Sequence, residues 1–182
     1  GVNCEIIFDN PTIKTLDHSS FNGYEGTKFV IPNSVTEIGN GAFQECKYLK
    51  EIILPDGLTT IADSLFYKCN ELEKVNIPNS VTEIGIFAFY DTPWLKNQPD
   101  GCVYIGNCFY KCKGEMPENT HIDIKEGTVQ ICGGAFSNCY WLTSVTIPES
   151  ITNVATIYIN NACFSCSSYN TFIKYCFHHF RK

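Results

Sequence analysis

Apolar and polar positions follow one pattern that the chain repeats every 23 residues. Residues 31–53 read IPNSVTEIGNGAFQECKYLKEII, and residues 54–76 read LPDGLTTIADSLFYKCNELEKVN. The matching positions of the two copies are Pro32 and Pro55, Val35 and Leu58, Ile38 and Ile61, Phe43 and Phe66, Cys46 and Cys69, Leu49 and Leu72, and Ile52 and Val75. Self-similarity at a fixed period is typical of proteins in which short coils stack on one another.

Weaker copies of the pattern cover most of the remaining chain. A weaker first copy carries Ile13, Leu16 and Phe21 with a one-residue shift relative to Val35, Ile38 and Phe43 of the second. We expect repeats at residues 8–30, 31–53, 54–76, 77–123, 124–146 and 147–173, followed by an unpatterned tail at 174–182. The fourth repeat is longer than one period, so we expect an insertion at about residues 96–119.

The insertion contains the segment CVYIGNCFYK, which favours a β-hairpin. Two short apolar runs flank Gly106 and Asn107, and glycine at the first turn position suits a type II′ turn. Such a turn sets Tyr104 opposite Phe109. Because the segment leaves the coil after Leu95 and returns immediately before a strand, we expect the hairpin to overhang the rim of the strand surface.

Each repeat contains one stretch with the alternation of a β-strand. In LKEIILP, Leu49, Ile52 and Leu54 point to one side, and Glu51 and Ile53 point to the other. The proline that follows ends the strand, because it lacks an amide donor and fixes φ. The rest of the repeat is expected to return as a short helical or irregular segment.

A single repeat cannot fold alone. About eight apolar side chains per repeat contribute roughly 10 to 25 kcal/mol gross on burial, whereas ordering the backbone costs about 1 to 2 kcal/mol per residue. Stability must therefore come from stacking coil on coil, with strands about 4.8 Å apart. The pattern predicts an elongated, curved parallel β-solenoid of about six coils.

Composition narrows the classes of partner. The net charge is −6, so binding to nucleic acid or to anionic lipid is disfavoured, since both need clustered Lys and Arg. The chain contains no run of about 18 apolar residues, so we expect no membrane insertion. Its first residues lack the basic and then apolar layout of a signal peptide, so any export signal would already have been removed.

The segment from Cys46 to Phe66 carries a family resemblance. It reads Cys-x-x-Leu-x-x-Ile-x-Leu-Pro-x-x-Leu-x-x-Ile-x-x-x-Leu-Phe and resembles the 23-residue leucine-rich repeat of bacterial BspA-like surface proteins. The segment DTPWLKNQPDGCVYIGNCFYKCKGEMPENTHIDIKEGT also resembles one found between repeats in that family. The resemblance covers residues 8–172. It implies a right-handed leucine-rich-repeat solenoid, in an exported or surface-attached protein that binds other proteins or host matrix.

The outward side chains of the strands are the first candidate binding surface. We expect the strands to line the concave face of the solenoid, where proteins of this architecture commonly bind partners. One predicted row contains Lys28, Glu51, Lys74, His121 and Ser144, and the next contains Val30, Ile53, Asn76, Asp123 and Thr146. The alternative interpretation is that Lys28, Glu51 and Lys74 only neutralise one another as neighbouring strand pairs.

Aromatic residues of the hairpin are the second candidate surface. Exposed Tyr104, Phe109 and Tyr110 could anchor a partner, since aromatic residues dominate binding hot spots. The alternative is that they pack back on the solenoid through Trp94.

The 11 cysteines require an explanation. Three of them, Cys46, Cys69 and Cys139, occupy one inward repeat position, where a free thiol acts as a small apolar side chain. A disulfide between Cys46 and Cys69 is disfavoured, because equivalent Cβ atoms one coil apart are about 4.8 Å apart, whereas a disulfide needs about 3.8 Å.

Metal binding and catalysis find little support. The metal alternative uses soft ligands near the C-terminus, namely Cys163, Cys166, Cys176, His178 and His179. Cys108 and Cys112 are a weaker metal pair, because residues at that spacing in a strand stand far apart. Catalytic fingerprints are absent, and the pair His121 and Asp123 lacks an evident nucleophile and pocket. We expect no enzyme, no metal and no cofactor.

The sequence therefore predicts a protein-binding module of a secreted or cell-surface bacterial protein, with adhesion to host or matrix proteins as its function. The alternative is a structural spacer, or a repeat fragment, without a ligand of its own.

Overall fold

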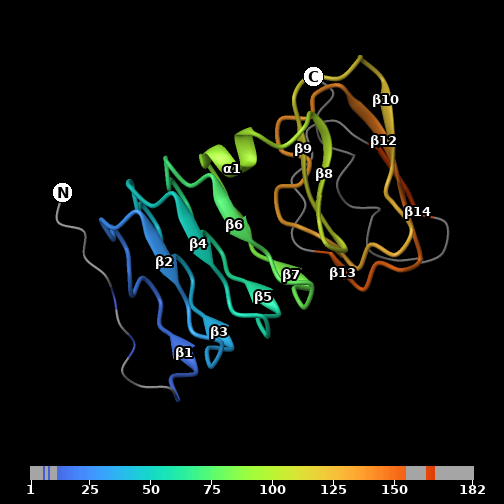
Figure 1. Cartoon of the computed structure of the whole chain (residues 1–182). Helices are drawn as coiled ribbons and strands as arrows, with labels where there is room; N and C mark the ends of the chain where they lie inside the picture. The colour runs from blue at the N-terminus through green and yellow to red at the C-terminus, as the bar shows by residue number, and fades with distance from the viewer. Residues whose placement is uncertain (1–5, 7, 9–11, 155–162, 167–182) are drawn as a thin grey trace. The chain divides into compact units, whose positions relative to one another are not determined.

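The computed structural model describes residues 6, 8, 12–154 and 163–166. The chain forms two compact units, residues 1–98 and residues 99–182. In each unit, strands from successive coils pair in parallel, which confirms the predicted parallel β-solenoid (Figure 1). The expectation that residues 1–182 form a single domain stays a prediction.

The first unit contains the predicted strand ladder. It consists of β2 (Lys28–Val30), β4 (Glu51–Ile53) and β6 (Lys74–Asn76). Lys28 pairs with Glu51, and Glu51 pairs with Lys74, so the register follows the sequence period of 23 residues. The outer residues of β2 are exposed and Phe29 between them is buried, as the alternation predicts.

A second, shorter ladder lies in the same coils, so the expectation of one strand per repeat is wrong. Its strands are two residues long and form two separate pairs, β1 (Thr15–Leu16) with β3 (Glu37–Ile38) and β5 (Thr60–Ile61) with β7 (Glu83–Ile84). Leu16 pairs with Ile38, which confirms the one-residue shift of the first repeat. Two residues are too few to produce a visible alternation in the sequence, and for that reason the pattern did not predict these strands.

Turns build the return segments, which the sequence left as helical or irregular. Two positions in each coil have positive φ: one row is Ser19, Gly41, Ser64, Phe87 and Gly134, and the other is Gly23, Glu45, Lys68, Asp91 and Asn138. At most of these positions the backbone N–H of the residue with positive φ points toward a carbonyl of the next coil. Gly41 N donates to Asp63 O at 2.9 Å, and Glu45 N donates to Tyr67 O at 2.8 Å. These turns therefore join neighbouring coils although they contain no strand.

The core of the first unit is a column of equivalent side chains. Phe43, Phe66 and Phe89 are fully buried, with ring centroids 6.2 and 5.4 Å apart. Cys46 and Cys69 are also fully buried, and the Cys69 thiol donates to the carbonyl of Phe43 at 3.0 Å. This confirms that a small apolar side chain fills the cysteine position.

One helix, α1 (Pro93–Lys96), follows the last coil of the first unit. Thr92 caps it, since Leu95 N donates to Thr92 Oγ1 at 3.2 Å, and proline at the first position supplies a preset φ. The indole of Trp94 packs 4.3 Å from the ring of Phe89, between centroids. The helix therefore covers the exposed end of the aromatic column.

The second unit contains two sheets. Its strands are β8 (Gly101–Ile105), β9 (Cys108–Lys113), β10 (Thr120–Asp123), β11 (Gln130–Ile131), β12 (Leu142–Ile147), β13 (Asn153–Val154) and β14 (Cys163–Cys166). One sheet has the order β10-β12-β14 and is parallel, and the other has the order β13-β11-β9-β8. Only the β8–β9 pair is antiparallel among the strand pairs of the described residues.

The hairpin forms as predicted, but its place in the coil differs. Tyr104 pairs with Phe109, and Gly106 has a φ of 54°. However, β9 also pairs in parallel with β11, and Ile131 lies beside Phe109. The expectation that the hairpin overhangs the rim is therefore wrong, because its second strand is a strand of the solenoid and only β8 is added at the sheet edge.

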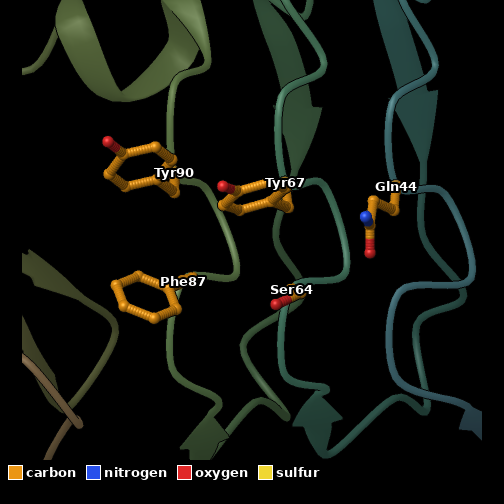
Figure 2. Close-up of a pocket in the computed structure, with 5 residues that line it drawn as sticks. All are labelled: Gln44, Ser64, Tyr67, Phe87 and Tyr90. Atoms are coloured by element: carbon orange, nitrogen blue, oxygen red, sulfur yellow. The ribbon is translucent and has the colours of Figure 1, made fainter.

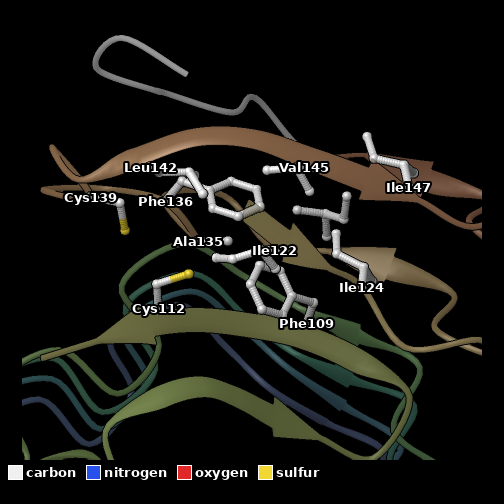
Figure 3. Close-up of a cluster of buried hydrophobic side chains, with 11 residues drawn as sticks. Phe109, Cys112, Ile122, Ile124, Ala135, Phe136, Cys139, Leu142, Val145 and Ile147 are labelled. Atoms are coloured by element: carbon white, nitrogen blue, oxygen red, sulfur yellow. The ribbon is translucent and has the colours of Figure 1, made fainter. Parts of the chain in front are cut away.

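The core of the second unit contains a thiol where the first unit has a phenyl ring. Phe66 N donates to Ala88 O, and at the equivalent place Cys112 N donates to Ala135 O at 2.7 Å. Cys112 thus occupies the phenylalanine position of its coil. Figure 3 shows it near Phe109, Ala135 and Phe136 in the buried cluster.

The predicted last repeat and tail fall largely on residues 155–162 and 167–182, which lie outside the described residues. Of this region, β13 and β14 extend the two ladders of the second unit. Across the part of the chain that the structure describes, no helix has the length and apolar character needed to cross a membrane.

Candidate partner-binding surfaces

Three charged residues form the first predicted row on the outward face of the β2-β4-β6 sheet. Lys28 Nζ lies 2.9 Å from Glu51 Oε1, and the register places Lys74 on the other side of Glu51. The hydrogen bond from Lys28 lowers the pKa of Glu51 below its ordinary value. The two side chains are 53% and 34% exposed, so this ion pair is solvated and contributes little to folding.

The second row on this face is apolar for two coils and polar in the third. Val30 is 52% exposed, and Ile53 beside it is half-buried. Asn76 follows in register, but its side-chain amide is hydrogen-bonded to the backbone of the neighbouring coil. Its Oδ1 accepts from Leu54 N at 2.7 Å, and its Nδ2 donates to Leu54 O at 3.3 Å. The apolar surface open to a partner is therefore centred on Val30 and Ile53.

A hollow lies at the end of this face near helix α1. It is lined by Glu51, Ile53, Glu73, Lys74, Asn76 and Trp94. Trp94 is held in place by two contacts: its ring packs against Phe89, and its backbone N–H donates to Leu72 O at 2.8 Å. A half-buried indole beside two exposed charges offers both apolar area and hydrogen-bonding groups to a ligand.

In the second unit, both predicted rows meet at His121. Nδ1 of His121 lies 2.6 Å from Ser144 Oγ, and Nε2 lies 3.0 Å from Asp123 Oδ1 and 3.0 Å from Thr146 Oγ1. Hydrogen bonds from His121 and then Thr146 lower the pKa of Asp123. The four residues come from β10 and the neighbouring β12, in the register that the sequence predicted.

The hydroxyl of Ser144 lies beside His121, so the expectation that His121 and Asp123 lack a neighbouring nucleophile is wrong. Catalysis by such a group needs a site that excludes water and stabilises developing charge. Here the side chains of His121 and Asp123 are 42% and 78% exposed. The geometry is therefore that of an exposed, hydrogen-bonded polar patch, and the described surroundings do not enclose it.

The hairpin aromatics do not form the exposed anchor that the sequence suggested. Phe109 is fully buried and Tyr110 is 5% exposed, so their expected exposure is wrong. Phe109 packs 5.1 Å from Phe136, between ring centroids, because β9 lies inside the ladder. Tyr104 stays half-buried, with Lys125 Nζ 4.3 Å from its ring centroid and its hydroxyl accepting from Lys125 N at 3.1 Å.

Sequence reasoning missed an exposed aromatic cluster in the return turns of the first unit. Tyr67 and Tyr90 stack with centroids 5.2 Å apart, and Phe87 meets Tyr90 edge to face at 5.7 Å. Phe87 and Tyr90 are 46% and 44% exposed. Figure 2 shows the three rings with Gln44 and Ser64 beside them, lining a shallow hollow.

Phe87 is also conformationally unusual. Its φ is 59°, in the left-handed region that a bulky residue rarely adopts, and Gly41 and Gly134 occupy the equivalent position elsewhere. A signal for this position was present in the sequence, because alignment of the repeats places Phe87 in a row with two glycines. Exposed aromatic area held in a strained turn marks the cluster as a secondary candidate surface.

Five of the seven free cysteines whose side chains the structure describes fall into two groups of neighbouring thiols. Cys46 and Cys69 form one group in the first unit, and Cys102, Cys112 and Cys139 form the other in the second unit. Of the proposed metal ligands, the side chains of Cys163 and Cys166 and the whole of Cys176, His178 and His179 lie outside the described residues. Within the described ranges, no group of three His, Cys, Asp or Glu side chains is arranged to hold a metal ion.

Comparison with known proteins supports the resemblance noted from the sequence. The model of the BspA type leucine rich repeat region matches residues 14–116 and 97–177, with six copies. No curated protein matches the chain.

Among solved structures, this chain is similar to leucine-rich repeat proteins. A leucine-rich repeat protein from Bacteroides ovatus is 22% identical over 86% of this chain, with a TM-score of 0.44. The leucine rich repeat protein TpLRR of T. pallidum is 22% identical over 84%, with a TM-score of 0.43. A leucine rich cell surface protein from Faecalibacterium prausnitzii is 19% identical over 83%, with a TM-score of 0.31. The chain spans 42% of the first of these proteins and 66% of each of the others.

Proposed function

This chain belongs to the BspA-type leucine-rich repeat family, and on that premise we propose that it is a protein-binding module of a secreted or surface-attached bacterial protein. Its partners are other proteins, and adhesion to host-surface or matrix proteins is the proposed role. Binding takes place on the outward face of the β2-β4-β6 sheet. The polar patch around His121, in the second unit, is proposed as a separate contact region.

One observation carries this proposal. The outward face of the first unit combines apolar area at Val30 and Ile53 with the charged row of Lys28, Glu51 and Lys74. A partly apolar centre with a polar rim is the usual composition of a protein interface. The ion pair between Lys28 and Glu51 places two of the three charges side by side on this face.

Phe109 and Tyr110 are not part of the proposed surface, because both are buried. Asn76 contributes only as a wall of the hollow near Trp94, since its amide is bonded to the backbone of Leu54. Tyr104 stays in the proposal as a half-exposed ring beside the charge of Lys125. The proposed binding face thus contains fewer residues than the face predicted from the sequence.

Charge reversal tests the proposal directly. The protein is used in pull-down assays against extracellular-matrix and host-surface proteins, with Glu51→Lys, Lys74→Glu and Asp123→Lys compared with the unchanged chain. We expect the reversals at Glu51 and Lys74 to weaken capture most, because they invert the charges that border the apolar centre of the face. Asp123→Lys should have a smaller effect.

Control variants reverse charges in turns, outside the strands. Lys47→Glu and Glu126→Lys are suitable, since both side chains are exposed. A partner that binds all five variants equally contradicts the assignment of the face. If no protein of the panel is captured at all, the alternative of a spacer without its own ligand is favoured.

A further inference from the structure

Three thiols meet in the second unit at the joint between the hairpin and the core. Cys102 lies in β8 and packs against the buried cluster that includes Cys112 of β9 and Cys139. The Cys112 thiol interacts electrostatically with both of the others, and together with burial this raises its pKa. Figure 3 shows the sulfur atoms of Cys112 and Cys139 within the cluster.

A β-bulge brings Cys102 and Cys112 opposite each other. Tyr104 pairs with Phe109, and an uninterrupted ladder would then place Cys102 opposite Lys111. The register instead shifts between Val103 and Tyr104, so Cys102 pairs with Cys112. Directly opposed residues in antiparallel strands have Cα atoms about 4.5 or 5.5 Å apart, and a disulfide accepts about 4.4 to 6.8 Å. The backbone therefore already has the spacing that a disulfide needs.

Cys102 is more exposed to solvent than the two neighbouring cysteines. Of the seven cysteines whose side chains the structure describes, Cys102 is the only one that is not buried. Cys112 and Cys139 are 4% and 2% exposed. An oxidant in solution therefore reaches the thiol of Cys102 first.

We propose that Cys102 and Cys112 are a reactive thiol pair that a low-molecular-weight disulfide, such as oxidised glutathione, converts into an intrachain disulfide. The Cys102 thiolate attacks one sulfur of the small disulfide and displaces a thiolate, which leaves a mixed disulfide on Cys102. The Cys112 thiol then gives its proton to the displaced small thiolate and attacks Cys102 Sγ, releasing the second small thiolate, which takes up a proton from solvent. Two protein thiols are oxidised, and one small disulfide is reduced to two thiols.

The surroundings of Cys102 support its role as the attacking group. The hydrogen bond from the Cys112 thiol, followed by the positive charge of Lys125, lowers the pKa of Cys102 to about 7. The cation–π contact with Tyr104 holds Lys125 Nζ at 4.3 Å from that ring. A thiolate that is populated near neutral pH and reaches solvent is the reactive form of cysteine.

The first unit contains a matched pair that should not react. Cys46 and Cys69 are also neighbours at one repeat position, but both are fully buried. Their thiols donate to backbone carbonyls, Cys46 to Phe21 at 3.2 Å and Cys69 to Phe43 at 3.0 Å. They lie on neighbouring coils with parallel side chains, in contrast to the opposed pair of the hairpin. Cys46 and Cys69 therefore serve as an internal control for reactions that depend only on proximity.

The test is peptide mapping of the folded full chain. The reduced protein is incubated with oxidised glutathione, quenched with acid, denatured and alkylated, and its disulfides are identified by mass spectrometry. We expect a Cys102–Cys112 linkage that dithiothreitol reverses, with Cys46 and Cys69 recovered as alkylated thiols. The variant Cys102→Ser should leave Cys112 and Cys139 reduced under the same treatment, because both are shielded from the oxidant.

A second variant separates the two steps. In Cys112→Ser the mixed disulfide with glutathione should accumulate on Cys102, since the resolving thiol is missing. If this variant does not fold, the comparison of the unchanged chain with Cys102→Ser still decides the question. A linkage of Cys112 to Cys139, an unreacted Cys102, a mixed disulfide that persists on Cys102 of the unchanged chain, or equal oxidation of Cys46 and Cys69 would each overturn the proposal.

Discussion

The two units place different side chains at the same core position of the repeat. In the first unit, coils of 23 residues each place a phenylalanine in one column, and the column is continuous from Phe43 to Phe89. In the second unit, the coil of β9 has Cys112 at that position, and an added strand, β8, covers its edge. The repeat pattern thus tolerates the loss of a ring where a hairpin supplies extra buried surface.

The same comparison separates two kinds of outward face. In the first unit a lysine and a glutamate form a simple ion pair beside apolar residues. In the second unit a histidine ring links two strands through three hydrogen-bonding partners. Equivalent positions of the repeat therefore present different chemistry, and this variation on a constant backbone allows a repeat protein to select its partners.

The largest expected effect is the loss of a ring from the middle of the column. Phe66→Ala should lower the free energy of unfolding by about 3 to 5 kcal/mol, because a fully buried phenyl group leaves a cavity between two coils. Phe21→Ala should cost clearly less, since Phe21 is only half-buried and lies in the first coil. Urea denaturation measures both changes, and equal losses would contradict the stacking account.

Oxidation of the hairpin is the next largest effect. A Cys102–Cys112 disulfide closes a loop of about ten residues and should stabilise the second unit by roughly 2 to 3 kcal/mol in the chain-entropy model. Hydrogen exchange of the oxidised chain should show slower opening of β8 and β9, with the β2-β4-β6 strands unchanged. Faster exchange in β8 and β9 would show that the disulfide strains the hairpin.

A third effect concerns the strained turn of Phe87. Phe87→Gly should be more stable than Phe87→Ala by about 1 kcal/mol, because both remove the ring and only glycine adopts a φ of 59° without steric cost. Thermal melts of the two variants give the difference. The matched position Gly41 should respond in the same direction, with Gly41→Ala less stable than the unchanged chain. An alanine variant as stable as the glycine variant at position 87 would show that the turn is not strained.

The smallest expected effect is the pH response of the carboxylates on the two outward faces. The pKa of Glu51 and the pKa of Asp123 are both lowered, by Lys28 and by His121 respectively. Each group therefore favours the folded state above the ordinary carboxyl pKa, and this contribution is lost as the pH falls through its lowered pKa. Titration by NMR should show both carboxyls ionising below their ordinary range. Added salt should weaken the shifts, since both groups are solvated.

Much of the fold could be predicted from the repeat period, because one offset fixed the pairing of β2, β4 and β6. The alignment of Lys28 with Glu51 and the one-residue shift of Leu16 both followed from counting residues. The place of β9 did not, because Cys108 and Phe109 were interpreted only as half of a hairpin. Their second partner, β11, belongs to a ladder of two-residue strands that leaves no alternation to detect.

The candidate sites were less predictable for two physical reasons. A bulge between Val103 and Tyr104 changes which residue Cys102 faces, and no feature of the sequence marks it. Burial of both Phe109 and Tyr110 also breaks the alternation expected of a strand with one exposed face. By contrast, the strained position of Phe87 was detectable, since the repeats align it with Gly41 and Gly134.

The most direct test of the proposed function is the affinity of a captured partner for the variant Ile53→Lys, measured by titration calorimetry. Ile53 lies at the centre of the outward face, so a partner that binds there should lose about 2 kcal/mol of binding free energy, or roughly 30-fold in affinity. The control variant Lys47→Glu should bind as the unchanged chain does. An affinity that Ile53→Lys leaves unchanged, with its thermal melt intact, would contradict the account.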